Sequence, residues 1–283
     1  MPIDPDRLLA WPIPEVRQAL RWQDCALYAL SLGAGADPMD KGALRFVADG
    51  PGMAMLPTMP VVLAYPGFWL ADPATGVDAT MLVHGEQGLV IHDALPVAGE
   101  LLGTSRVTGL VDRGAGRGAL LYTERLVTEA VTGRLLATLT QTIFLRGDGG
   151  FGGPTGPVRR PPPEPEGPPE TVIDLPTRPD MALLYRLNGD LNPLHSDPGV
   201  AAAAGFPRPI LHGLATFGVV GRALLAGLAG GDPARLLGMS CRFSAPVFPG
   251  ETIRTEIWPG GAFRARVLER DLIVASHGQA TLG

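Results

Sequence analysis

The alternation of apolar and polar positions along the chain predicts two halves of similar organisation. Short runs in which apolar and polar residues alternate are typical of half-buried strands. In the first half these runs cover residues 103–112, 119–127 and 135–145. In the second half they cover residues 239–243, 252–258, 263–269 and 272–277. A continuous apolar stretch at residues 214–228 precedes the second set and predicts a buried helix.

A stretch rich in glycine and proline lies between the two halves. This composition favours an extended, semi-rigid connection without a packed core. We therefore expect an N-terminal domain over residues 1–150, a linker over residues 151–170 and a C-terminal domain over residues 171–283. With 283 residues, of which 46% are hydrophobic, the chain is long enough to fill two modest cores.

The first indication of chemistry is a carboxylate and an imidazole in a loop that contains proline. Asp190 and His195 are five residues apart, so a regular helix would point them about 140° away from each other. Pro193 disfavours helical backbone before it, so a helix over residues 182–187 is expected to break near Gly189. The resulting turn can bring both side chains together, which suits general acid–base catalysis. The same residue types are also ordinary loop residues, and taken singly they leave both interpretations open.

The longer segment 181–224 resembles the hydratase 2 motif of the MaoC-like dehydratases. That motif is an aromatic residue, then Gly-Asp-x-Asn-Pro-apolar-His, then a small residue, then His-Gly at the start of a helix. The residues that match it are Tyr185, Gly189, Asp190, Asn192, Pro193, Leu194, His195, Ala201, Leu211, His212 and Gly213. Asn188 departs from the pattern, because the family usually has Ser, Thr, Gly or Cys at this position.

The resemblance implies an α+β double hotdog fold, in which each half is an antiparallel sheet wrapped around a long central helix. It implies reversible syn hydration of trans-2-enoyl-CoA to (3R)-3-hydroxyacyl-CoA, without a metal or a redox cofactor; coenzyme A is part of the substrate. Asp190 and His195 would then activate the water and deliver the proton, and Asn192 would orient the water or the carboxylate. The amide of Gly213 would donate to the thioester oxygen, a role that its place at a helix start also favours.

Other candidate substrate-binding residues surround this motif. Tyr185 is its aromatic residue, and His212 either contacts substrate or holds the loop through a carbonyl. The phosphates of coenzyme A need cations, for which Arg208 is the candidate near the motif. Further candidates on predicted strands are Arg264, Arg266 and Arg270.

The two halves also show faint sequence repetition. Residues 95–101 are similar to residues 246–252, and residues 56–63 occupy the place of residues 211–217. The counterpart of the catalytic loop, residues 30–38, has no histidine, so the first half is expected to be catalytically inert and to accommodate the acyl chain. Residues that would line such an acyl tunnel, or else fill an ordinary core, are Met53, Met55, Leu56 and Met59. A further segment, His84-Gly85-Glu86-Gln87, resembles a stretch common to two-domain relatives and receives no role.

Composition excludes several other classes. The net charge of −5 argues against binding of nucleic acid. The widely separated Cys25 and Cys241 form neither a disulfide framework nor a metal site, and the remaining histidines lack partners at ligand spacing. Neither a secretory signal, a peroxisomal Ser-Lys-Leu ending nor a membrane span is recognisable, so a cytoplasmic enzyme is expected, either a monomer or a homodimer.

Two other functions stay open at this stage. A hotdog acyl-CoA thioesterase would use the same pair of residues to direct water at the thioester carbonyl, because the fold alone does not define the reaction. A non-catalytic acyl-CoA-binding subunit would keep the fold without the reaction. The Asn-Pro-Leu-His sequence at residues 192–195 favours the hydratase over both.

Overall fold

A single antiparallel sheet of ten strands organises the protein. The computed structural model describes residues 3–283. The strands are β1 (Val16–Leu20), β2 (Leu82–Ile91), β3 (Gly99–Asp112), β4 (Ala119–Glu129), β5 (Leu135–Leu145), β6 (Thr171–Pro176), β7 (Leu236–Phe243), β8 (Thr252–Ile257), β9 (Ala262–Val267) and β10 (Leu272–Leu282). Their order in the sheet is β1-β3-β4-β5-β2-β7-β10-β9-β8-β6. The seven predicted strands are therefore present, whereas β1, β2 and β6 were not predicted.

The two halves of the chain each supply five neighbouring strands, and they meet at one seam. At this seam β2 pairs with β7, in register from Glu86 opposite Arg242 to Val90 opposite Gly238. Residues 151–170 run between the halves without a helix or strand before β6 begins. The molecule is thus built from two sheets of five strands joined edge to edge.

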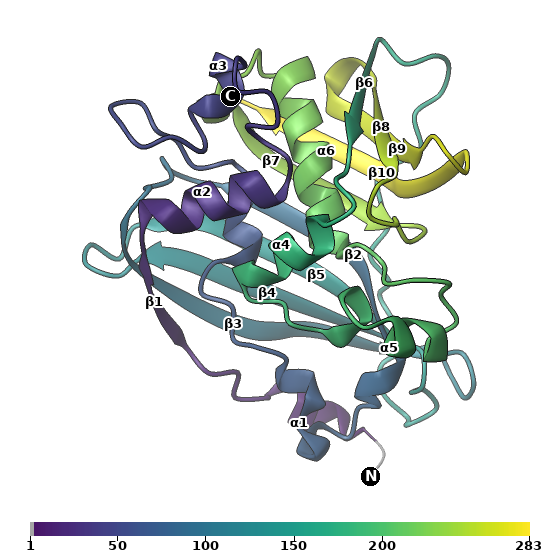
Figure 1. Cartoon of the computed structure of the whole chain (residues 1–283). Helices are drawn as coiled ribbons and strands as arrows, with labels where there is room; N and C mark the ends of the chain where they lie inside the picture. Colours follow the sequence, from purple (N-terminus) through teal and green to yellow (C-terminus); the bar gives the residue numbers. More distant parts are fainter. Residues whose placement is uncertain (1–2) are drawn as a thin grey trace.

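Helices cover one face of the sheet, as Figure 1 shows. The α-helices are α1 (Pro5–Leu9), α2 (Trp22–Ser31), α3 (Lys41–Leu44), α4 (Met181–Tyr185), α5 (Pro198–Ala203) and α6 (Gly213–Gly227). Short 3-10 helices are η1 (Met59–Val62), η2 (Trp69–Ala71), η3 (Pro73–Thr75), η4 (Ala79–Met81), η5 (Arg186–Asn188), η6 (Pro193–His195), η7 (Pro233–Arg235) and η8 (Pro259–Gly261). The helix predicted at residues 214–228 is α6. Within residues 3–283 no helix is both long and apolar enough to cross a membrane.

The long central helix expected in each half is present only in the second. In the first half the corresponding segment, residues 56–63, contains only the single turn η1. Pro57 and Pro60 explain this difference, because each removes an amide hydrogen that an α-helix would use. The longest helix of the first half is α2, with 10 residues, and it comes earlier in the chain.

Helix α6 packs closely against the first half through glycines. A β-carbon at Gly218 would lie 2.5 Å from Leu32, and one at Gly221 would overlap Thr58. Larger residues at these positions would push the two halves apart, which explains why an otherwise apolar helix contains glycine. One hydrophobic core therefore runs through both halves and includes residues of α2, η1 and α6.

Candidate active site

The loop that carries the predicted chemistry has the broken-helix shape expected from its sequence. Helix α4 ends at Tyr185, η5 continues to Asn188, and the chain turns at Gly189 with φ of 113°. This value of φ favours glycine over residues with a side chain. The next turn, η6, begins at Pro193 and is capped by Asn192, whose side chain accepts a hydrogen bond from the Leu194 amide at 3.0 Å.

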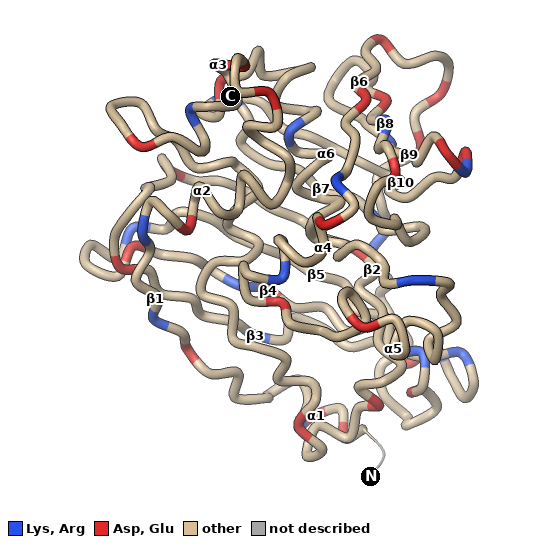
Figure 2. The backbone as a smooth tube through the Cα atoms, in the orientation of Figure 1, with Lys and Arg blue, Asp and Glu red and all other residues tan. Residues whose placement is uncertain are grey.

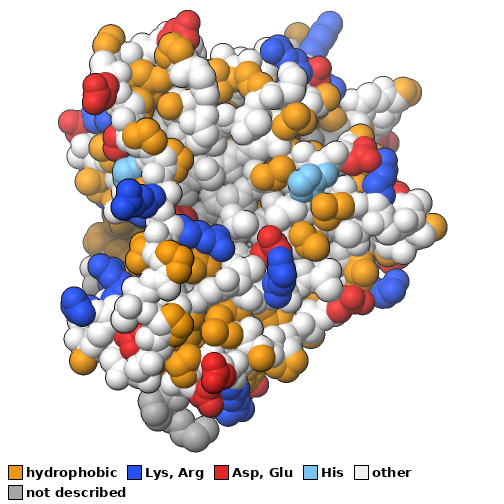
Figure 3. All heavy atoms as spheres, turned by 180° about the vertical axis from the view of Figure 1, so that it is seen from behind, with side chains coloured by type: hydrophobic (Ala, Val, Ile, Leu, Met, Phe, Trp, Pro, Cys, Tyr) orange, Lys and Arg blue, Asp and Glu red, His pale blue; other side chains and the backbone are white. Residues whose placement is uncertain are grey.

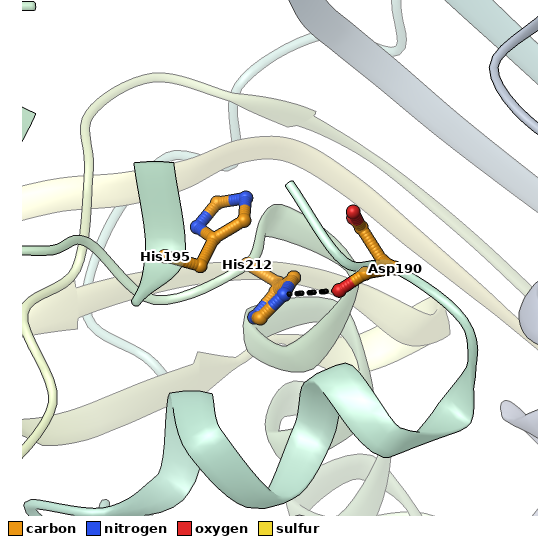
Figure 4. Close-up of side chains that lie close together, drawn as sticks. All are labelled: Asp190, His195 and His212. Atoms are coloured by element: carbon orange, nitrogen blue, oxygen red, sulfur yellow. Dashed lines mark hydrogen bonds between the residues drawn. The ribbon is translucent and has the colours of Figure 1, made fainter. Parts of the chain in front are cut away.

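Three side chains converge inside this loop, and Figure 4 shows them together. Asp190, His195 and His212 each offer a carboxylate oxygen or ring nitrogen, and these atoms lie within 4.8 Å of one another. The structure thus brings together the predicted pair and adds the histidine that precedes α6. The Asp190 carboxylate also accepts a hydrogen bond from the Asn192 amide at 3.2 Å, so the loop backbone helps to orient it.

His195 is arranged to act as a base. Its Nδ1 lies 2.9 Å from the Ile210 carbonyl oxygen. A carbonyl oxygen only accepts, so Nδ1 carries the hydrogen and Nε2 keeps a free lone pair. Burial lowers the pKa of His195 below its ordinary value, although the negative charge of Asp190 opposes this shift. The ring is therefore neutral at pH 7 and able to accept a proton.

His212 is held beneath the loop. Its side chain is only 1% exposed, and its Nε2 donates to the Asp190 carbonyl oxygen at 3.2 Å. Its ring stacks on His195 with centroids 3.7 Å apart and an angle of 27° between the planes. Burial and the neighbouring His195 lower the pKa of His212 to about 4. These contacts support the interpretation that His212 holds the loop.

A carboxylate with two histidines is also a donor set that binds transition metals. Here each ring already makes one hydrogen bond to a carbonyl through one nitrogen. Because lone pairs lie in the ring plane, two stacked rings direct their remaining nitrogens in nearly parallel planes instead of toward one point. The geometry of the cluster therefore fits proton transfer better than metal ligation.

Gly213 is the first residue of α6. The residue before it, His212, caps the helix with an extended backbone, at φ −56° and ψ 138°. No carbonyl within residues 3–283 accepts a hydrogen bond from its amide, as is usual for the first turn of a helix. A β-carbon at Gly213 would lie 3.6 Å from the ring of Phe243, which is ordinary contact. A free amide at a helix N-terminus is suited to stabilise an oxygen that gains negative charge.

Asn188, the one departure from the motif, connects the loop to the first half. Its side-chain amide donates to the Ser31 hydroxyl at 3.0 Å and to the Tyr185 carbonyl at 2.9 Å. Ser31 is the last residue of α2, and its hydroxyl donates in turn to the Tyr28 carbonyl at 2.7 Å. Asparagine reaches this partner across the halves, whereas the shorter residues usual in the family would not.

This contact leads to a testable expectation. Ser31→Ala and Asn188→Ser should each destabilise the protein by about 0.5–1.5 kcal/mol, because each removes the same hydrogen bond. In a double-mutant cycle measured by denaturant unfolding, the double variant should lose less stability than the sum of the two single losses, because the shared hydrogen bond is lost only once. Fully additive losses would show that the two residues are not coupled.

The predicted substrate-binding residues Tyr185, Met55 and Met59 are all buried. Tyr185 is fully buried and packs against His212, with ring centroids 5.0 Å apart; its hydroxyl has no hydrogen-bond partner within the described chain. Met55 and Met59 are 3% and 2% exposed and belong to the core shared by both halves. None of the three faces solvent.

The four arginines considered for binding the phosphates of coenzyme A differ in whether they already form an ion pair. Arg264, Arg266 and Arg270 each pair with a nearby carboxylate. Arg208 is exposed, lies over the Phe248 ring at 5.1 Å and has no carboxylate partner within residues 3–283. Figure 2 shows positive and negative residues intermixed along the tube, without a broad basic face. Arg208 is therefore the candidate of the four that is free to bind a phosphate.

Sequence reasoning missed residues that the first half places at this site. His84 of β2 packs edge-on against Phe243, with centroids 5.1 Å apart. Partial burial raises the pKa of Tyr65, which is 42% exposed; Arg125 opposes this shift, and the charge of Asp190 adds to it. Only the segment at residues 84–87 carried a sequence signal, as a stretch typical of two-domain relatives.

Comparison with known proteins identifies related domains in both halves of the chain. Residues 161–275 match the family described as MaoC like domain, and residues 19–147 match the MFE-2 hydratase 2 N-terminal domain. The chain is 42% identical to 3-hydroxyacyl-thioester dehydratase Y of Mycobacterium tuberculosis, over 96% of this chain and 94% of the relative. It is 38% identical to the peroxisomal enoyl-CoA hydratase 2 of Arabidopsis thaliana, over 95% of this chain and 92% of the relative.

Solved structures show the same architecture. A MaoC-like dehydratase from Phytophthora capsici, 32% identical, superposes with a TM-score of 0.86 over 98% of both chains. The peroxisomal multifunctional enzyme type 2 of Drosophila melanogaster, 36% identical, gives 0.81 over 95% of this chain, which spans 48% of the fly protein. A Mycobacterium tuberculosis protein described as a double hotdog gives 0.56 over 96% of this chain and 94% of its own at 17% identity, which supports the fold alone. The double hotdog fold is confirmed, and the chain belongs to the MaoC-like dehydratase family as a hydratase or dehydratase whose N-terminal half is of the hydratase 2 type.

Proposed function

We propose that the protein catalyses the reversible syn hydration of trans-2-enoyl-CoA to (3R)-3-hydroxyacyl-CoA. The observation that carries this proposal is the free Nε2 of a neutral His195 beside the Asp190 carboxylate, at the N-terminus of a helix with a free amide. Relatives named enoyl-CoA hydratase 2 and 3-hydroxyacyl-thioester dehydratase support the same reaction class.

The residues present meet the needs of this reaction. The oxygen of water bonds to C3 while one water proton passes to the acid–base pair of Asp190 and His195. The same pair returns a proton to C2 on the same face, so the addition is syn. Charge that collects on the thioester oxygen is stabilised by the Gly213 amide, and Asn192 holds the loop in shape through its cap and its own amide.

Substrate binding follows from the remaining positions. Arg208 is proposed to bind a phosphate of coenzyme A, because its guanidinium is exposed and free of carboxylates. The acyl chain is proposed to enter the hydrophobic core that both halves share, on the side of the first half. There the flexible side chains of Met55 and Met59 would repack around it. No metal or redox cofactor takes part in the proposed reaction. A homodimer and a cytoplasmic location stay predictions.

A combined assay distinguishes hydration from thioester hydrolysis. Purified protein is incubated with crotonyl-, octenoyl- and decenoyl-CoA while the enoyl-thioester absorbance, free thiol and product configuration are measured. Loss of the enoyl signal without free thiol, giving the 3R alcohol, supports the proposal and ranks the chain lengths. Release of thiol would show a thioesterase, and no change in either signal would contradict catalysis on these substrates.

The pH dependence of the reaction should report His195. The neutral ring is the base, and burial lowers its pKa, so kcat/KM should stay constant as the pH falls to about 6.5, the ordinary imidazole value, and decline only below it. The measurement is kcat/KM from pH 5 to 8 with substrate well below KM. An acidic limb centred at or above the ordinary value would contradict this arrangement.

A further inference from the structure

The segment His84-Gly85-Glu86-Gln87 forms a bulge in β2, beside the seam between the halves. In a regular strand, residues 84 and 86 would point to the same face of the sheet. Here the pairing of β2 with β5 shifts by one residue between His84 and Glu86. A β-carbon at Gly85 would lie 3.2 Å from the Thr142 carbonyl oxygen, so the bulge favours glycine at this point.

On one side of the bulge, Glu86 ties the seam together on the outer face of the sheet. Its carboxylate accepts hydrogen bonds from Arg242 of β7 and from the Thr142 hydroxyl, both at 2.7 Å. Glu86, Gln87 and Arg242 line a groove on this outer face, and Figure 3 shows the back of the molecule hollowed near its centre. The side chain of Glu86 therefore points away from the catalytic loop.

On the other side of the bulge, His84 points to the inner face and toward the candidate active site. Its ring meets the edge of Phe243 at 5.1 Å with 76° between the planes. Phe243 in turn lies near Gly213, the proposed oxyanion donor, since a β-carbon added at Gly213 would be 3.6 Å from its ring. Bulges next to active sites often re-aim a side chain, and this one places an imidazole of the first half beside Phe243 and close enough to Asp190 to feel its charge.

The protonation of His84 is fixed by its surroundings. Its Nε2 lies 3.1 Å from the Glu86 carbonyl oxygen, so Nε2 carries the hydrogen and Nδ1 is an acceptor. The side chain of Gln87 lies beside this ring, and its amide donates to the Gly88 carbonyl at 2.8 Å. Burial lowers the pKa of His84 to about 4, although the charge of Asp190 opposes the shift. His84 is thus a neutral acceptor that does not take up a proton at pH 7.

We propose that His84 is a further residue of the active site, and that its Nδ1 accepts a hydrogen bond from the hydrogen that the attacking water retains. The proposal rests on the hydration function. Water brings two hydrogens: one leaves to the acid–base pair as the bond to C3 forms, and the other remains on the new 3-hydroxyl. An acceptor for the retained hydrogen turns the oxygen lone pair toward C3. The first half then supplies part of the reaction chemistry as well as room for the acyl chain.

Three substitutions test this role. His84→Phe keeps a ring against Phe243 but removes both nitrogens, and it should lower kcat by about tenfold to a hundredfold with little change in KM. His84→Asn keeps an acceptor near the position of Nδ1 and should recover most of this loss. His84→Gln places its amide near Nε2 instead and should not. The matched control is His92→Phe, because His92 is an exposed residue just beyond the end of β2.

The outcomes separate this proposal from the proposed function. Suppose that the wild-type protein hydrates enoyl-CoA and that the kcat of His84→Phe stays within about twofold of the wild-type value. This loss is smaller than a misplaced water would cause, so only the role of His84 would be wrong. Equal activity of the Asn and Gln variants would also overturn it, and this comparison holds even if the Phe variant does not fold. Melting temperatures of all variants close to that of the wild type would exclude a purely structural loss. If the wild-type protein does not hydrate enoyl-CoA, the proposed function itself fails.

Discussion

Replacement of His195 by Gln, or of Asp190 by Asn, is expected to lower kcat/KM for hydration by about 10²–10⁴-fold, the usual contribution of general acid–base catalysis. The polar atoms of the two side chains lie within 4.8 Å of each other, so under the proposed mechanism we expect them to act as one unit. Both changes nearly preserve side-chain volume. We therefore expect the fold and the melting temperature to change little, which circular dichroism and thermal unfolding would check.

The double variant sharpens this expectation. Residues that act as one unit lose little more when both are removed than when one is removed. His92→Gln is the matched control, because this exposed histidine lies outside the site and should leave kcat/KM unchanged. A single variant that stays folded and keeps a substantial fraction of wild-type turnover would contradict the assignment of the pair.

The second large effect is expected at the Gly213 amide. Gly213→Pro removes the amide hydrogen at the first position of α6, where proline is well tolerated. His212 already has the extended backbone that a residue before proline requires, with ψ of 138°. If this amide stabilises the thioester oxygen, kcat should fall by about a hundredfold or more.

Gly213→Ala provides the control for this substitution. It adds a β-carbon in ordinary contact with Phe243 but keeps the amide hydrogen. The comparison of kcat between the Pro and Ala variants therefore measures the donor separately from the added bulk. If both variants lose the same amount of activity, crowding would be the cause and the amide would have no role in catalysis.

The parts of the site that could be predicted are those with local signals. Gly189 and Pro193 break the helix within a few residues of Asp190 and His195, and the start of α6 follows from the His-Gly pair before a long apolar run. Backbone rules for glycine and proline act over short distances, so they can be applied to a sequence without knowledge of the fold. The predicted strands follow from alternation in the same way.

The parts that could not be predicted depend on contacts between distant residues. Asn188 and Ser31 are 157 residues apart, and their hydrogen bond exists only because α4 packs against α2. The ion pairs of the three arginines depend on neighbouring strands and turns, which residue spacing does not reveal. The bulge at Gly85 interrupts the alternation that identifies strands, which explains why β2 was missed and why His84 was not assigned to the site.

The most direct test of the account is hydration of trans-2-octenoyl-CoA in D₂O. The configuration at C2 and C3 of the product would be determined by NMR and chiral analysis. A single acid–base pair on one face predicts that deuterium at C2 and the hydroxyl at C3 are added to the same face. The proposed hydratase 2 reaction further predicts a 3R alcohol and no release of free thiol. Anti addition or thiol release would contradict the central claim that Asp190 and His195 hydrate the double bond from one side, and a 3S product would contradict the proposed (3R) reaction.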